Sequence, residues 1–145
     1  MATWRTMQAG RVLMGRGAFG QDLLEEITGV CRAEGVTLGR VEALGAVQKA
    51  RVGYYNQAAR RYQFLDLDRP LEITALVGNV SLKDGRPMVH AHVTLGDERG
   101  NAFGGHLAPG TVIFACEFVI QDLSGEPLER GLDEQTGLPL WGMDD

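Results

Sequence analysis

A long run of strand-like segments behind a single helical pattern most constrains the fold of this chain. Apolar residues recur at helical spacing over roughly Gln21–Ala33 and predict one amphipathic helix, with Gly35 as its C-terminal stop. Trp4–Met14 is expected to form a strand before this helix. The later segments carry strand patterns separated by Gly, Pro, Asn and Asp: Thr37–Val47, Lys49–Asn56, Arg61–Asp66, Leu71–Leu82, Met88–Leu95 and Thr111–Leu123. We therefore predict an α+β fold, a mainly antiparallel sheet with one long helix of the N-terminal half packed on it.

Length and composition fit one globular domain. At 145 residues, with 44% hydrophobic and 23% charged residues and no long linker, the chain is expected to form a single domain over 1-145. The start, MATWRTMQAGR, lacks the apolar stretch of a signal peptide, and the longest apolar run, near Val112–Ile120, is too short to span a membrane. We expect a soluble, cytoplasmic protein with no membrane partner.

Two predicted strands are apolar on both faces. In the predicted strand Thr111–Leu123, simple alternation places two sets of residues on opposite sides. One side has Val112, Phe114, Cys116, Phe118 and Ile120, and the other has Ile113, Ala115, Glu117 and Val119. In the other strand it opposes Leu71, Ile73, Ala75 and Val77 to Glu72, Thr74, Leu76 and Val80. One helix covers only one face of a sheet, so the second face must curl on itself or be covered by another subunit. We predict a homo-oligomer.

A glycine-rich stretch imitates a dinucleotide site. Gly15–Gly20 spells G-x-G-x-x-G between a strand and a helix, and Glu42 follows about twenty residues later. The first strand carries polar residues, Glu42 falls inside a strand pattern, and no further βα units follow. These observations favour a flexible turn into the helix, with an anion held by the helix-start amides as a milder alternative.

Two histidines share one face of a predicted strand. The apolar residues of Met88–Leu95 occupy alternate positions, which leaves His90 and His92 together on the other face. Residues two apart on a strand are separated by about 6.5 to 7 Å at Cα, and imidazoles can close that gap to reach a shared ion at about 2.0 to 2.1 Å. A half-exposed strand can also carry two histidines for no chemical purpose, so this pair alone is a weak signal.

The third histidine strengthens the metal hypothesis. His106 follows Gly104-Gly105, whose missing side chains permit close backbone approach, and a turn at Gly96–Gly100 would return the chain beside the first pair. Three neutral imidazoles leave a coordination position open to water or a small ligand, and zinc is the first candidate for the divalent metal. Glu72 or Glu117 could act as fourth ligand, as a partner of a ligating histidine or as general acid or base, or could be a structural carboxylate.

Several stretches resemble one protein family. They are Pro70-Leu71-Glu72-Ile73, Gly78-Asn79, His90-Ala91-His92, Gly104-Gly105-His106-Leu107 and Cys116-Glu117-Phe118, with weaker matches from Asp22-Leu23-Leu24 to Thr136-Gly137-Leu138. In order and spacing they resemble the PPC domain, the "plants and prokaryotes conserved" domain, in its prokaryotic stand-alone form. The resemblance implies a compact α+β domain that assembles as a homotrimer, with His90, His92 and His106 holding a metal such as zinc.

The resemblance also brings a DNA-binding label, which other features oppose. Plant members carry an AT-hook ahead of the domain, whereas Gly85-Arg86-Pro87 here lacks flanking basic residues and has the pattern of a turn. The net charge of −5 opposes nonspecific binding to phosphates. Three hypotheses stand: a trimeric metal-binding protein with an open site, whether or not it is an enzyme; a DNA-binding or regulatory partner; and a non-catalytic assembly module. Arg130, Tyr54, Tyr55 and Trp141 are interpreted as packing residues outside the site.

Overall fold

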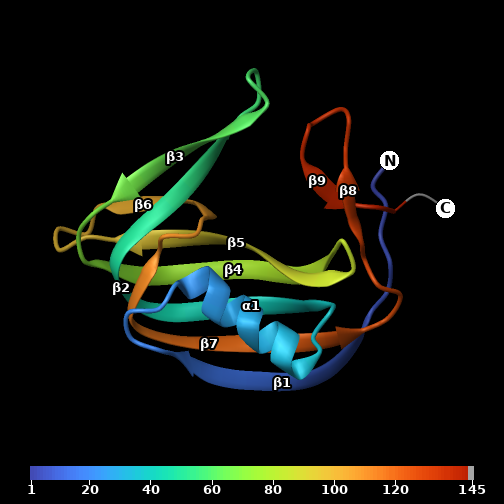
Figure 1. The fold of residues 1–145 in the computed structure, drawn as a ribbon, viewed down its shortest axis with the longest axis horizontal. Helices are drawn as coiled ribbons and strands as arrows, with labels where there is room; N and C mark the ends of the chain where they lie inside the picture. Colours follow the sequence, from blue (N-terminus) through green and yellow to red (C-terminus); the bar gives the residue numbers. More distant parts are fainter. Residues whose placement is uncertain (144–145) are drawn as a thin grey trace.

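One antiparallel sheet carries the fold, as predicted. The computed structural model of the chain describes residues 1–143. The helix is α1 (Leu23–Glu34), and the strands are β1 (Gln8–Gly17), β2 (Gly39–Asn56), β3 (Arg61–Leu67), β4 (Leu71–Lys83), β5 (Arg86–Gly96), β6 (Ala102–Leu107), β7 (Val112–Ser124), β8 (Arg130–Leu132) and β9 (Pro139–Trp141). The sheet runs β1-β7-β2-β4-β5-β6, with β3 paired to β2, and β8 and β9 form a separate hairpin (Figure 1). Because β6 also pairs with β2, strands β2, β4, β5 and β6 close into a ring.

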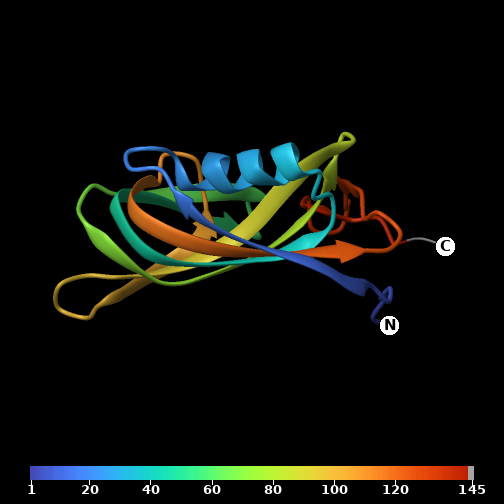
Figure 2. The same ribbon diagram turned by 90° about the horizontal axis from the view of Figure 1, so that it is seen from below.

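The single predicted helix is present and lies against one face of the sheet (Figure 2). Asp22 caps its start by accepting a hydrogen bond from the Glu25 amide, and Gly35 ends it in the left-handed conformation at φ 68°. Leu23, Ile27 and Cys31 of its apolar stripe are fully buried. No helix within residues 1–143 is long and apolar enough to cross a membrane.

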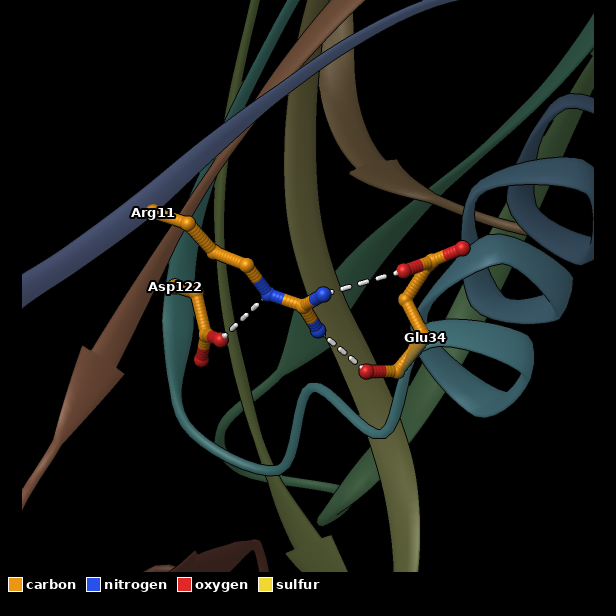
Figure 3. A network of polar contacts seen from close by, with 3 residues as sticks. All are labelled: Arg11, Glu34 and Asp122. Atoms are coloured by element: carbon orange, nitrogen blue, oxygen red, sulfur yellow. Dashed lines mark hydrogen bonds and ion pairs between the residues drawn. The ribbon is translucent and has the colours of Figure 1, made fainter.

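Arg11 ties the end of the helix to the edge of the sheet (Figure 3). Its Nε lies 3.2 Å from a carboxylate oxygen of Asp122 on β7, and its Nη1 lies 3.1 Å from a carboxylate oxygen of Glu34. Nη2 also donates to the Glu34 carbonyl oxygen. A guanidinium here satisfies a carbonyl at the negative end of the helix dipole, which favours cations.

Two β-bulges overturn the faces predicted by simple alternation. Phe114 of β7 is 58% exposed although it was predicted to share the side of Cys116, because the register shifts between the partners of Val47 and Ala46. In β4 the register shifts between Ile73 and Ala75, so Leu76 is buried with Ile73 while Val77 is 53% exposed. An extra residue in one strand reverses the facing of all residues beyond it.

The structure also corrects the predicted boundaries of β2. Thr37–Val47 and Lys49–Asn56 form one continuous strand, with a register shift against β7 between Val47 and Lys49. The side-chain amide of Gln48 donates at 3.0 Å to the carbonyl of Ile113, which satisfies a backbone acceptor at the irregularity. The Gln48 side chain therefore stabilises the register irregularity at the position where we had predicted a boundary between two strands.

The G-x-G-x-x-G motif has a packing explanation, and Gly85 has a conformational one. A Cβ on Gly15 would lie 2.3 Å from the Phe118 ring, so the first glycine of G-x-G-x-x-G permits β1 to pack against a core aromatic. The Glu26 carboxylate accepts from the Ala18 amide at 2.9 Å, so the turn before the helix already has an internal anion. Asp84 and Gly85 both have positive φ, 52° and 70°, in a two-residue turn between β4 and β5. A turn is therefore present, but of the predicted Gly85-Arg86-Pro87 only Gly85 belongs to it, because Arg86 and Pro87 already pair within β5.

Candidate metal centre

Two adjacent strands bring the three histidines together. His90 and His92 alternate with the buried residues of β5, such as Ala91 and Val93, and therefore lie on the sheet face opposite the helix. His106 of β6 is the register partner of His92. The hairpin predicted to return His106 to the pair is confirmed.

The imidazoles form a compact triangle. Their ring centroids are separated by 5.3 Å for His90 and His92, 5.1 Å for His90 and His106, and 5.7 Å for His92 and His106. One ring nitrogen of each residue lies within 4.8 Å of the others. Tetrahedral ligands at 2.0–2.1 Å from zinc are about 3.4 Å apart, so modest side-chain rotations would place all three nitrogens on one ion.

Gly104 and Gly105 position His106, as predicted. A Cβ on Gly104 would lie 2.8 Å from the Val93 carbonyl oxygen, and one on Gly105 would lie 2.6 Å from the Gly53 carbonyl oxygen. The backbone of β6 lies so close to β5 on one side and to β2 on the other that neither position has room for a side chain. The paired glycines allow His106 to reach the register position opposite His92.

The surroundings favour neutral imidazoles. Burial, followed by the charge of Arg130 and the neighbouring rings, lowers the pKa of His90 to about 4. Burial also lowers the pKa of His106, with smaller contributions from His92 and Arg130. A neutral imidazole has the free lone pair that a metal needs, so these two residues are ready to ligate at neutral pH.

An unsatisfied nitrogen shows that the histidine set fits a metal. Nδ1 of His106 is buried and has no hydrogen-bond partner among residues 1–143. Tyr62 packs against the same imidazole, with ring centroids 4.8 Å apart. Buried polar atoms are usually paired because desolvation is costly, so an unpaired nitrogen beside two other imidazoles has the position expected of a ligand atom.

The two candidate glutamates lie away from this triangle within the chain. Glu72 is five residues along β4 from Val77, the register partner of His92, a separation of roughly 16 Å. Glu117 lies on β7, three strands from β5, or roughly 14 Å away. Neither joins the histidine group, and their suggested roles remain predictions that would require a second subunit.

Arg130 was interpreted as a packing residue, but the structure places it beside the site. Its Nη2 donates at 2.6 Å to Oδ1 of Asn79, which is the register partner of His90. Its guanidinium also lies over the Trp141 ring, 5.5 Å from the centroid. Asn79 and Ser81, two polar residues on one face of a largely apolar strand, were the sequence signal that could have indicated a polar partner here.

Known proteins resemble this chain in sequence and structure. An archaeal protein from Archaeoglobus fulgidus, described as metal-containing, is 43% identical, with a TM-score of 0.90 over 94% of this chain and 96% of its own. The Pyrococcus horikoshii plant- and prokaryote-conserved protein is 39% identical, with a TM-score of 0.91 over 100% of this chain and 99% of its own.

A longer relative contains a similar segment. The bifunctional protein GlmU of Synechococcus sp. (strain JA-2-3B'a(2-13)) is 35% identical over 120 residues, which cover 81% of this chain but only 18% of that protein. The family pattern of the Plants and Prokaryotes Conserved (PCC) domain, the family abbreviated PPC above, matches residues 5–124. The chain therefore belongs to the Plants and Prokaryotes Conserved domain family.

Proposed function

We propose that the protein binds a divalent metal ion, with zinc as the first candidate, through His90, His92 and His106. The observation that carries this proposal is the close approach of three imidazole nitrogens, within 4.8 Å of one another, with a buried Nδ1 of His106 that lacks a partner. The metal-containing description of the A. fulgidus relative supports the same assignment. A cytoplasmic setting is part of this proposal.

Three protein ligands leave the centre open. Catalytic zinc sites commonly have three protein ligands and one exchangeable position, whereas structural sites are usually closed by four. When bound, such an ion would supply a Lewis acid at which water or a small ligand can be held. His90 and His106 favour the neutral state, and Tyr62 packs against His106 and restricts its ring. We propose a small-ligand or hydrolytic role for this open position.

We also propose that the chain assembles as a homotrimer. The sheet face opposite the helix leaves apolar side chains in water, with Leu44 61%, Val77 53% and Met14 80% exposed. These three residues, from β1, β2 and β4, line one groove. A continuous exposed apolar surface favours burial against another subunit, and the trimer comes from the resemblance to PPC domains.

Metal analysis tests the centre directly. We expect about one zinc per chain in the untagged protein and none in the His90→Ala/His92→Ala variant. The matched control is Asp66→Ala/Asp68→Ala, which removes two potential ligands at the same i, i+2 spacing and should retain the metal. Absence of stoichiometric metal from the parent protein would refute the proposal and favour a plain assembly module.

Light scattering tests the assembly. We expect three chains per particle for the parent protein, and smaller particles for Leu44→Arg, because a charge in an apolar interface remains unpaired. A monomeric parent at micromolar concentration would contradict the trimer but leave the metal proposal untouched.

A further inference from the structure

A buried guanidinium lies next to the proposed metal centre. Arg130 is only 8% exposed, and its three nitrogens each make one hydrogen bond. Nε donates to Oγ of Ser81 at 2.8 Å, Nη1 to the Pro139 carbonyl at 3.0 Å, and Nη2 to Oδ1 of Asn79 at 2.6 Å. All three acceptors are neutral. Arg130 is therefore held firmly in place, and within residues 1–143 it has no anionic partner.

No side chain in the described part of the chain provides a counterion for Arg130, which is unusual for a buried arginine. None of the ion pairs within residues 1–143 includes Arg130. A guanidinium has five N–H donors, so three hydrogen bonds leave one N–H free on each of Nη1 and Nη2. Buried charges are normally paired because an isolated charge is costly to desolvate. A bound anion would both neutralise Arg130 and accept these hydrogen bonds.

The Arg130 guanidinium lies near the three histidines. Asn79 and His90 face each other across β4 and β5, and directly opposed residues have Cβ atoms about 4.5–5.5 Å apart. Arg130, which is hydrogen-bonded to Asn79, consequently lies beside His90 on the same face of the sheet. A divalent ion on three neutral imidazoles beside Arg130 would bring three positive charges together, and no carboxylate of the described chain pairs with Arg130.

We propose that the ligand of this centre is a small oxyanion, a carboxylate or phosphate group, with one oxygen at the open metal position and another on the Arg130 guanidinium. This inference rests on the metal-binding function proposed above. The planar guanidinium suits bidentate recognition of carboxylate and phosphate oxygens, and charge-assisted hydrogen bonds are stronger than neutral ones. Arg130 thus becomes a ligand-binding residue that selects for negative charge.

Calorimetric titration of zinc-loaded protein provides the test, with acetate and inorganic phosphate as separate probes and acetamide as the neutral analogue. The visible spectrum of the cobalt-loaded protein independently reports whether the probe enters the metal coordination sphere. We expect one or both anions to bind and to change this spectrum, and acetamide to do neither. The two anion arms distinguish a carboxylate site from a phosphate site.

Two variants remove the free positive charge in different ways. Arg130→Gln should retain the metal and weaken anion binding ten- to a hundredfold, as expected for losing hydrogen bonds to a charged group. Asn79→Asp preserves Arg130 and the shape of its acceptor but supplies an internal carboxylate, so it should weaken anion binding similarly even if Arg130→Gln fails to fold. Gln21→Glu, which adds the same charge at an exposed position before the helix, is the control and should bind like the parent.

The outcomes separate this inference from the metal proposal. Metal-loaded parent protein that binds neither anion, or folded variants that bind anions as tightly as the parent, would overturn the inference and leave the metal centre intact. If a carboxylate from a neighbouring subunit already occupied Arg130, the metal-loaded parent protein would bind neither anion. A parent protein that takes up no metal would overturn the proposed function and this inference together.

Discussion

The two faces of β5 show how one strand serves both packing and chemistry. Val89, Ala91, Val93 and Leu95 are at most 5% exposed on the face toward the helix. On the opposite face, His90 is partly buried and His92 is exposed. The buried face supplies stability through apolar burial. The other face is therefore free to carry polar groups that fold stability alone would not select.

The largest expected effect is a difference in the free energy of unfolding between substitutions on the two faces of β5. Leu95→Ala should lower the free energy of unfolding by about 2–5 kcal/mol because it leaves a cavity at a fully buried position. His92→Ala, measured on chelator-treated protein, should cost less than about 1 kcal/mol. Urea denaturation of both variants provides the measurement, and Leu65→Ala, at a 52% exposed position, is the control. Equal losses for Leu95→Ala and His92→Ala would erase the distinction between the faces.

An intermediate effect is expected where backbone packing positions a ligand. Gly105→Ala should destabilise the chain by about 1–3 kcal/mol and weaken zinc binding, because the added Cβ would lie 2.6 Å from the Gly53 carbonyl oxygen and push His106 aside. Thermal unfolding and competitive chelator titration measure these two effects. Gly29→Ala, in the helix with no atom within 4 Å of its Cβ, should instead stabilise by about 0.5–1 kcal/mol. Tight metal binding by Gly105→Ala would contradict the positioning role.

A smaller effect is expected from pH on the metal-free protein. The pKa of His90 is lowered to about 4 in the folded chain from 6.5. The unfolded chain therefore takes up this proton first, so stability present above pH 6.5 should decline as the pH falls toward 4. After allowance for partial solvent access, His90 should contribute roughly 1–2 kcal/mol to this decline. Urea midpoints across this range measure it, and His90→Gln should flatten the curve; an unchanged slope in the variant would assign the decline to other groups.

The smallest effect concerns the rim of the helix-covered face. Arg11→Met should lower stability by about 0.5–1 kcal/mol, because Arg11 and Glu34 are about half-exposed and exposed ion pairs contribute little. The difference from the parent should shrink in high salt, where exposed charges are screened. Denaturation at two salt concentrations measures this effect. A loss as large as that of Leu95→Ala would show that the Arg11 network, rather than apolar burial, fixes the helix on the sheet.

Local sequence patterns predicted the positions of the helix and strands better than they predicted which face of the sheet each side chain occupies. The Gly35 stop of the helix, the turn that includes Gly85 and the β5 alternation are all determined by residues close together in sequence, and the structure contains all three. The bulges near Ala75 and Phe114 depend on pairing between strands, so the periodicity of a single strand did not reveal them. The short β8 and β9 strands were also missed because three-residue strands give almost no periodic signal.

The same distinction applies to the site. The three histidines fall within seventeen residues on neighbouring strands, and their convergence was predictable from the turn and the Gly104-Gly105 pair. Arg130 comes from a hairpin far along the chain, and its placement depends on Asn79 and Ser81 of β4. A contact between such distant segments requires the tertiary fold. Sequence reasoning therefore identified the candidate ligands and missed the charge beside them.

The C-terminal hairpin has a consequence for where this domain ends. The family pattern stops at residue 124, yet Leu128 is 4% exposed, and Arg130 covers Ser81, which is fully buried. Tyr55 also donates to the Thr136 carbonyl at 2.7 Å, joining the β2–β3 hairpin to this segment. A protein trimmed to the shared family region would retain all three histidines but lose one wall of their site. The structural unit of this chain therefore extends beyond the region that the family pattern matches.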